Sequence, residues 1–169
     1  MVCPGEPVAF DASMSVDWDG ALVRHLWDFG DGTTADGEQV LHSFEQPGVY
    51  EVRLAVTDDS GARCATSVDI ARVHVNAPPQ AVAGSDRGGF VGGAHDSLLF
   101  DASQSANPDG KPLSYVWDLG DGITRTGEKV LHSYGDEGEY VVRLAVSDGT
   151  GLACGQSLDE VKVDVRRRE

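Results

Sequence analysis

The hexapeptide WDFGDG at Trp27–Gly32 returns 90 positions later as WDLGDG at Trp117–Gly122. Three further runs recur at the same spacing: FDAS from Phe10 and Phe100, VLHS from Val40 and Val130, and VRLAV from Val52 and Val142. Aligned without a gap, residues 10–58 and 100–148 share 27 of 49 positions. A repeat of this length is long enough to bury its own core, so it indicates a duplicated domain.

The length of 169 residues fits two domains of this size, which we predict at residues 1–76 and 77–169. The 28 acidic residues outnumber the 13 basic ones and give a formal net charge of −15. Nucleic acid is therefore excluded as a partner, because its phosphates bind a basic surface. No apolar run is long enough to span a bilayer, so membrane insertion is not expected. The acidic balance fits plain solubility or the collection of cations.

Strand-forming runs in the second copy alternate with turn signals, as in an all-β fold. Within residues 139–147 (EYVVRLAVS), Tyr140 and every second residue after it are placed on one face. The Asp-Gly pair at residues 121–122, shortly after Trp117, supplies the positive φ of a tight hairpin turn. We predict strands at residues 80–84, 97–100, 114–119, 130–134, 139–147 and 158–165. About seven short strands spaced by turns specify a β-sandwich.

The first copy has no counterpart of the strand predicted at residues 80–84, because Met1 aligns with Val91. Two explanations are open: the sequence was cut there, or something outside this chain completes the edge. An uncovered edge offers its main-chain N–H and C=O groups to a strand from elsewhere. We therefore predict two sandwiches in tandem, the first lacking its first strand.

Four runs in this order resemble the PKD (polycystic kidney disease) domain family: WDFGDG, HSF at residues 42–44, GVYEVRLAVTD at residues 48–58, and PPQAVAG at residues 78–84. The resemblance covers nearly the whole chain and implies seven-stranded immunoglobulin-like sandwiches. Leu119 stands where the family usually has Phe, a change of volume that a core tolerates. The resemblance also implies an extracellular or cell-surface protein, in which such domains serve as spacers and interaction modules.

Two functions fit this resemblance. The first is a structural spacer or filament module, whose partners are neighbouring repeats or a copy of itself end to end. The second is an accessory binding module of a secreted hydrolase or adhesin, which attaches to polysaccharide or protein. A binding face should expose a row of aromatic side chains, whereas Trp18 is the only tryptophan without a repeat partner. We therefore prefer the spacer.

The repeated polar and aromatic residues predict structure rather than catalysis. Duplicated hairpins do not bring two carboxylates into one cleft, so Asp28 and Asp118 are predicted to accept backbone N–H groups in turns. No GxSxG, GxGxxG or P-loop pattern occurs, and the histidines have no metal-ligand spacing. We predict no enzymatic activity, and we place the following repeated residues in the cores: Trp27, Trp117, His42, His132, Tyr50 and Tyr140.

Calcium is the one cofactor that the sequence suggests, because it prefers oxygen ligands on loops. The loop before the Trp strand carries Asp17 and Asp19 in the first copy, and Asn107 and Asp109 in the second. The resemblance implies such a site, since PKD-like domains of secreted collagenases hold calcium with this type of loop and the linker before it. Ordinary turn chemistry is the alternative explanation of the same residues.

Cys64 and Cys154 occupy equal positions in the two copies, and Cys3 is the remaining cysteine. In the sandwich that the resemblance implies, Cys3 and Cys64 lie at opposite ends of one domain, ~20 Å apart. Bonded cysteines need Cα atoms about 4.4–6.8 Å apart, so these two should not pair. A head-to-tail array would instead place Cys3 against Cys154 as an interdomain bridge, and Cys64 would need a partner outside this chain. Three unpaired core thiols are the alternative.

Overall fold

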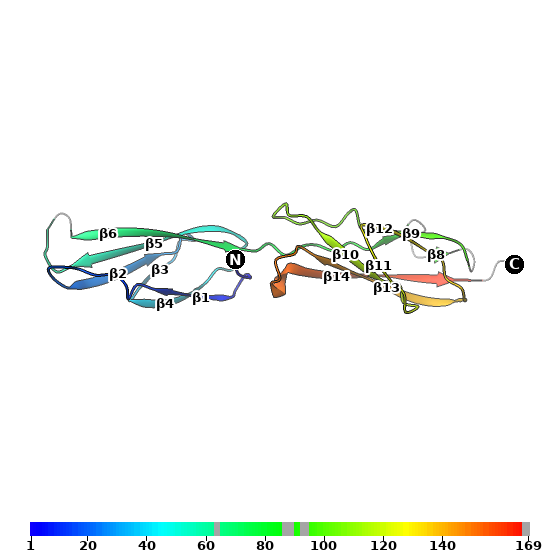
Figure 1. Ribbon diagram of the computed structural model, residues 1–169, viewed down its shortest axis with the longest axis horizontal. Helices are drawn as coiled ribbons and strands as arrows, with labels where there is room; N and C mark the ends of the chain where they lie inside the picture. The colour runs from blue at the N-terminus through cyan, green and yellow to red at the C-terminus, as the bar shows by residue number, and fades with distance from the viewer. Residues whose placement is uncertain (63–64, 86–89, 92–94, 167–169) are drawn as a thin grey trace. The chain divides into compact units, whose positions relative to one another are not determined.

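The computed structural model describes residues 1–62, 65–85, 90–91 and 95–166 and is drawn as a ribbon in Figure 1. The chain divides into two compact units, unit 1 (Met1–Asn76) and unit 2 (Ala77–Glu169). Regular structure in the described residues is β-strand, apart from one turn of 3-10 helix, η1 (Ala153–Gly155). The chain is all-β, as predicted. Across the described ranges, no helix has the length and apolar character needed to cross a membrane.

Unit 1 consists of two antiparallel sheets. Its strands are β1 (Pro7–Asp11), β2 (Leu22–Asp28), β3 (Thr34–Asp36), β4 (Gln39–Ser43), β5 (Gly48–Asp58) and β6 (Thr66–Val75). One sheet has the order β3-β2-β5-β6, and the other consists of β1 and β4 (Figure 1). The register pairs Phe10 with Val40 in the small sheet and Trp27 with Leu54 in the large one.

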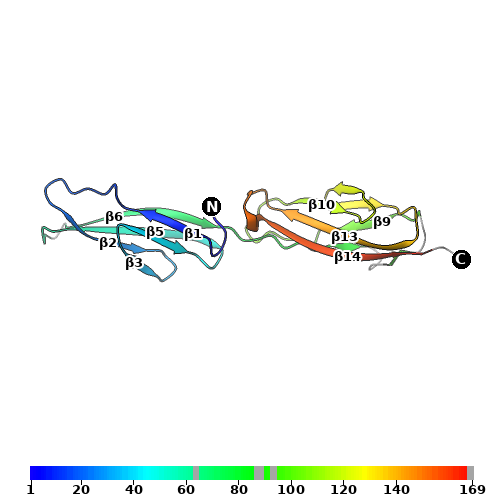
Figure 2. The same cartoon turned by 90° about the horizontal axis from the view of Figure 1, so that it is seen from below.

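Unit 2 repeats this arrangement and adds two short strands at its start. Its strands are β7 (Gly84–Ser85), β8 (Phe90–Val91), β9 (Leu98–Asp101), β10 (Ser114–Asp118), β11 (Thr124–Thr126), β12 (Lys129–His132), β13 (Gly138–Ser147) and β14 (Gln156–Val165). The larger sheet has the order β11-β10-β13-β14-β8, and the smaller one β12-β9-β7. Both views show β13 and β14 running side by side along the unit (Figures 1 and 2).

Glycine is required at the same point of the hairpin that follows the Trp strand in each unit. Gly30 and Gly120 have φ values of 74° and 81°, in the left-handed region. A Cβ atom at either position would lie 2.7 Å from a main-chain oxygen, that of Glu51 or Val141. Because backbone cannot move aside cheaply, the conformation and the close approach both demand glycine.

The two cores contain equivalent residues but differ in size. The cluster of buried residues in unit 2 has twelve members: Leu98, Phe100, Ala102, Trp117, Leu119, Val130, Tyr134, Val142, Leu144, Val146, Val163 and Val165. In unit 1 the corresponding cluster has seven: Phe10, Ala12, Trp27, Phe29, Phe44, Val52 and Val75. Leu144 and Val146 are fully buried, whereas their counterparts Leu54 and Val56 are only partly buried. The first unit therefore covers its core less completely.

The strand predicted at residues 80–84 is only partly a ladder strand. Gln80 forms an isolated bridge with Ala106, and β7 begins at Gly84. The N–H groups of the residues between them donate to side chains instead of to a neighbouring strand. A pattern of small residues thus predicts an extended segment correctly but not which acceptors hold it.

Candidate functional site

The aspartates of the repeated hexapeptide organise the hairpin that follows each Trp strand. The Gly30 N–H donates to Asp28 Oδ1 at 2.9 Å, and the Gly120 N–H donates to Asp118 Oδ1 at 3.0 Å. Both bonds span two residues, which is the geometry of an Asx turn. These carboxylates therefore fix the turn, as the sequence analysis predicted for them.

Each hairpin also holds a histidine of the neighbouring sheet. His42 Nε2 lies 2.7 Å from Asp31 Oδ2, and His132 Nε2 lies 2.7 Å from Asp121 Oδ2. His132 is buried and His42 is partly buried. Burial opposes ionisation of Asp31, but hydrogen bonds from Thr33 and His42 outweigh it and lower the pKa of that carboxyl. The pair is a bridge between the two sheets of each sandwich.

The two repeated tryptophans sit at equivalent core positions. Trp27 and Trp117 are 6% and 0% exposed. Each indole N–H donates to a main-chain carbonyl, that of Gly37 at 2.9 Å or of Gly127 at 3.0 Å. The polar atom of each ring is thus satisfied inside the fold, as a buried tryptophan requires.

The tyrosines predicted in the cores, Tyr50 and Tyr140, are partly buried and pack against the core clusters. The Tyr50 hydroxyl donates to the Gln46 carbonyl at 2.8 Å, and the Tyr140 hydroxyl donates to the Asp136 carbonyl at 3.0 Å. Both bonds reach back four residues and close the corner that leads into β5 and β13. These residues too are part of the framework.

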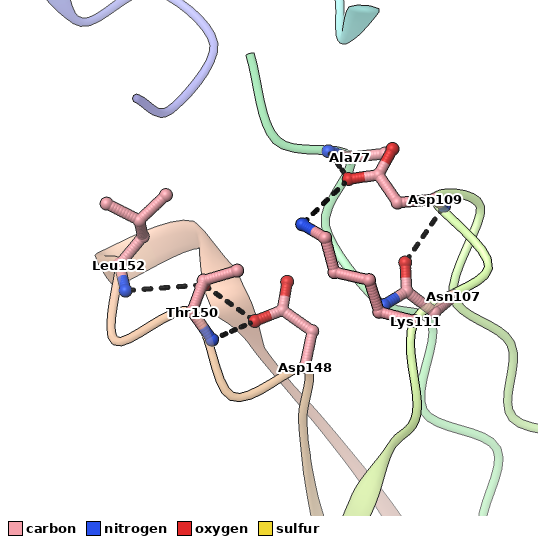
Figure 3. A network of polar contacts seen from close by, with 7 residues as sticks. All are labelled: Ala77, Asn107, Asp109, Lys111, Asp148, Thr150 and Leu152. Carbon is pink, nitrogen blue, oxygen red and sulfur yellow. Dashed lines mark hydrogen bonds and ion pairs between the residues drawn. The ribbon is translucent and has the colours of Figure 1, made fainter. Parts of the chain in front are cut away.

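The loop of unit 2 proposed for calcium holds the main chain at the start of the unit instead. Asp109 Oδ2 accepts the Ala77 N–H at 3.0 Å and lies 3.5 Å from Lys111 Nζ (Figure 3). Asn107 Oδ1 accepts the Asp109 N–H at 3.0 Å. The carboxylate is therefore engaged with an N–H donor and a cation, whereas calcium needs six to eight oxygens, and calcium at this loop stays a prediction.

A second turn in the same view lies between β13 and β14. Asp148 Oδ1 accepts both the N–H and the hydroxyl of Thr150, and the Thr150 hydroxyl accepts the Leu152 N–H at 3.4 Å (Figure 3). Asp148 is 7% exposed. A Cβ at Gly155 would lie 2.6 Å from Asp148 Oδ1, so any larger residue there would clash with the carboxylate.

The other residues proposed for metal binding, Asp17 and Asp19, lie on the matching loop of unit 1. Asp17 Oδ1 accepts the Asp19 N–H at 3.4 Å, as in the second copy. Ala21 stands where unit 2 has its lysine. No group of three or more His, Cys, Asp or Glu side chains suited to a metal ion occurs among the residues that the structure describes. Calcium at this loop stays a prediction.

Cys3 and Cys154 are both disulfide-bonded. Cys3 precedes β1 in unit 1, and Cys154 lies in η1 of unit 2. The prediction that this chain contains oxidised cysteine is confirmed. Cys64 lies outside the described residues, so a partner for it beyond this chain stays a prediction.

Polar groups of unit 2 bind the residues that open the unit, residues 77–85, which we name the lead-in segment. Gln80 exchanges two main-chain hydrogen bonds with Ala106. The next three residues donate their N–H groups to side chains: Ala81 to Ser157 Oγ at 3.2 Å, Val82 to Ser105 Oγ at 3.0 Å, and Ala83 to Asp159 Oδ2 at 2.8 Å. Ala81 and Ala83 also pack against the core. Sequence reasoning missed these acceptors, although Ser15, Ser67 and Asp69 repeat them exactly 90 positions earlier in the first copy, a signal the alignment contained.

Comparison with known proteins identifies relatives of both units. The family described as PKD domain matches residues 1–73 and 76–163. A microbial collagenase of Vibrio alginolyticus is 46% identical over 79 residues, which are 47% of this chain and 9% of that protein. The pre-pro-metalloprotease PrtV of Vibrio cholerae serotype O1 is 32% identical over 137 residues, or 81% of this chain and 14% of that protein.

A human protein and a solved structure are also similar to parts of this chain. Polycystin-1 of Homo sapiens is 33% identical over 132 residues, which are 76% of this chain and 3% of that protein. The crystal structure of the PKD1 domain from Vibrio cholerae metalloprotease PrtV aligns with 52% of this chain and 96% of its own at 30% identity, with a TM-score of 0.43. The chain spans less than a sixth of the length of each of these three curated relatives.

Proposed function

Since this chain belongs to the PKD domain family and carries two matches to it in tandem, we propose that it is a non-catalytic spacer module of a larger extracellular or cell-surface protein. Its partners are neighbouring repeats of the same kind. The observation that carries the proposal is the use of the repeated residues. Each copy puts its tryptophan, histidine and hairpin aspartates into the same internal bonds at nearly the same distances.

The residues on either side of the unit boundary are each held within their own unit. Asn76, the last residue of unit 1, is 1% exposed, and its N–H donates to the Val2 carbonyl at 2.9 Å. Ala77, the first residue of unit 2, donates to Asp109.

The disulfide-bonded cysteines give the spacer a covalent element. We propose that Cys3 pairs with Cys154, because Cys64 could serve only one of these two oxidised residues. A bridge that closes a loop of this length stabilises by roughly 4–5 kcal/mol in the chain-entropy model. Such a bridge also supports an oxidising location outside the cytosol.

The spacer is tested by whether the two units tumble together. ¹⁵N relaxation of the whole chain should give one rotational diffusion tensor for amides of β5 and β13. The control is a variant with a Gly-Ser insertion after Asn76, in which the two sets of amides should separate. Independent tumbling of the units in the unaltered, oxidised chain would refute the spacer.

An accessory binding module remains the second candidate, because Trp18 is 93% exposed. A face that carries an exposed indole can stack on a sugar ring or a protein surface. Co-sedimentation with insoluble polysaccharides and with collagen fibres, compared between the protein and Trp18→Ala, tests this role. Binding that Trp18→Ala abolishes would favour it over the spacer.

Calcium is tested loop by loop. Calorimetric titration into chelator-treated protein, with Asp19→Ala and Asp109→Ala as separate variants, assigns any heat to unit 1 or unit 2. The engagement of Asp109 with Lys111 leads us to expect no heat from the second loop. Heat lost only in Asp19→Ala would place calcium at the first loop, and no heat at millimolar calcium would exclude it from both.

A further inference from the structure

A row of apolar side chains crosses the outer face of the larger sheet in unit 2. It consists of Val116 on β10, Ala145 on β13 and Leu158 on β14, which the register places directly beside one another. The residues that follow or precede them along the strands, Trp117 and Leu144, are buried in the core. Because side chains alternate between the two faces of a strand, the row points away from the core.

Unit 1 carries the same row 90 positions earlier. Leu26 on β2, Ala55 on β5 and Val68 on β6 are neighbours in the register. In the described part of the chain, none of the six residues belongs to the core clusters or to the partly buried side chains packed against them. We name the two sets of three residues the apolar rows. Their repetition makes them a feature of both domains.

The bulky residues at the ends of the apolar rows are largely exposed. Leu158, Val68 and Val116 are 75%, 59% and 46% exposed, and Leu26 is partly buried. The lead-in segment of unit 2 leaves the row uncovered, since it donates to Asp159, which lies on the opposite face of β14 from Leu158. Adjoining apolar side chains in contact with water are typical of an interaction surface.

Each apolar row is low in its middle and high at its ends. Ala55 and Ala145 stand on the central strand of the three, and a valine or leucine stands on the strand at either side. This relief forms a shallow trough for a bulky side chain, and the end residues of one row fit the trough of another. Two such faces can therefore interdigitate as the sheets of a sandwich do, about 10 Å apart.

The face around the row of unit 1 is electrically balanced, although residues 1–76 contain 13 acidic and four basic residues. The strands of this face carry three residues of each charge. Asp28 lies opposite Arg53 in the register. The ion pairs are these: Arg24 with Asp36 at 2.8 Å, Arg53 with Glu51 at 2.9 Å, and Arg72 with Glu51 at 3.9 Å. The formal charges on the face therefore cancel.

The row of unit 2 is likewise flanked by uncharged and paired residues. Ser114 and Ser147 adjoin it on one side. On the other side Arg143 lies 3.9 Å from Glu160 and opposite Asp118 in the register. Both faces thus have an apolar centre and a polar rim, which is the anatomy of a protein–protein interface.

A second copy of this chain is the partner that these faces fit. Two molecules of net charge −15 repel each other over most of their surface, and the repulsion is smallest where opposite charges cancel. The apolar rows lie in such a place. They contain no aromatic ring, which a face that stacks on sugar rings would present.

We propose that the outer faces of the larger sheets pack against those of a second copy, row against row. This goes beyond the proposed spacer function, because it makes the chain a module that associates side by side with others of its kind. The apolar rows supply the buried centre, and the ion pairs remain at the rim in contact with water.

The size of one face predicts a weak association. Three strands about 4.8 Å apart, with three outward residues on each, cover roughly 300 Å². A standard interface buries about 800 Å² on each partner. Dimers should therefore form at roughly millimolar concentrations of the chain.

Sedimentation equilibrium of the oxidised chain, from about 20 µM to about 2 mM, measures the dimer. Cys64→Ser serves as the background, so that no intermolecular disulfide forms at that residue. We expect monomer at the lowest concentration and a substantial fraction of dimer at the highest. Raising NaCl from about 0.05 M to about 0.5 M should strengthen the dimer severalfold, because salt screens the repulsion between two acidic chains.

A double variant with a matched control assigns the interface. Val68→Thr together with Leu158→Thr removes the exposed apolar ends and keeps residues that favour strands. It should raise the dissociation constant at least about tenfold. The control is Leu41→Thr together with Leu131→Thr, since these leucines are 73% and 64% exposed but lie on the smaller sheets. It should leave the dissociation constant within about twofold.

Concentration-dependent ¹⁵N shifts locate the contact in the same samples. Amides of the apolar rows should shift between the lowest and the highest concentration, whereas amides of β4 and β12 should not. Unchanged shifts in the rest of each unit show that the variants remain folded.

Three outcomes would overturn the proposal. The first is a chain that stays monomeric at about 2 mM in about 0.5 M NaCl, whether or not another partner binds the rows. The second is a dimer that the control weakens as much as the row variant does. The third is a dimer that weakens as salt rises, since charges would then hold it. The spacer is decided separately, because its relaxation measurement uses dilute monomer.

Discussion

Replacing Asp159 by alanine should destabilise unit 2, while the matched change Asp69→Ala should leave unit 1 nearly unaffected. Asp159 accepts the Ala83 N–H at 2.8 Å across 76 residues of sequence, and it is partly buried. Hydrogen bonds to charged groups contribute about 1.5–3 kcal/mol, and solvent at this site reduces the expected loss to about 1–2 kcal/mol. Asp69 is exposed and its carboxylate accepts the N–H of the adjacent Ile70, so we expect a change within about 0.5 kcal/mol.

Urea unfolding followed by residue-resolved NMR measures the two units in one sample. The backbone amide of Val142 in β13 reports on unit 2, and that of Val52 in β5 reports on unit 1. With the m-values typical of small domains in urea, the unfolding midpoint of unit 2 should fall by about 1 M urea in Asp159→Ala. Equal shifts of both units in the two variants, or no shift of unit 2, would refute the assignment of Asp159 as an anchor of the lead-in segment.

Three further predictions concern the cores and the oxidised cysteines. Trp117→Ala should cost unit 2 about 3–5 kcal/mol because the ring is fully buried, and calorimetry should show Trp27→Ala unfolding unit 1 while unit 2 persists. Burial raises the pKa of Tyr134, so the folded state favours its neutral form: stability is complete below the unfolded pKa of about 10 and falls as pH rises above it, and Tyr134→Phe should reduce that alkaline loss in pH-dependent melting. Non-reducing peptide mapping should yield a linked peptide of Cys3 and Cys154, and a peptide linking Cys3 to any other cysteine would contradict the pairing.

Much of the fold follows from local sequence. Alternation places Val142 and Leu144 on the buried face of β13, and the Asp118–Gly120 turn forms through a bond that spans two residues. Because such interactions act within a few positions, each is visible in the sequence without knowledge of the rest of the chain. The 90-residue repeat then extends every local prediction from one copy to the other.

The role of the Asp-rich loop could not be decided locally. Asn107 and Asp109 have the residue types of a calcium loop and of a turn, and only the fold brings the Ala77 N–H to Asp109 across 32 positions. The position of Lys111 Nζ near the same oxygen likewise depends on the direction that its side chain takes in the fold. Side-chain oxygens of Asp and Asn can bind a cation or accept a main-chain N–H group, so the tertiary structure is needed to identify their partner.

The sequence by itself determined that this chain contains two copies of one all-β domain. Only the tertiary structure decided which donors the polar side chains of each copy meet: Asp159 accepts the Ala83 N–H, whereas the equivalent Asp69 is exposed. The physical reason is the separation in sequence between the residues that make contact. Hairpins form between neighbours in sequence, whereas Asp159 and Ala83 meet across 76 residues because two sheets close on one core.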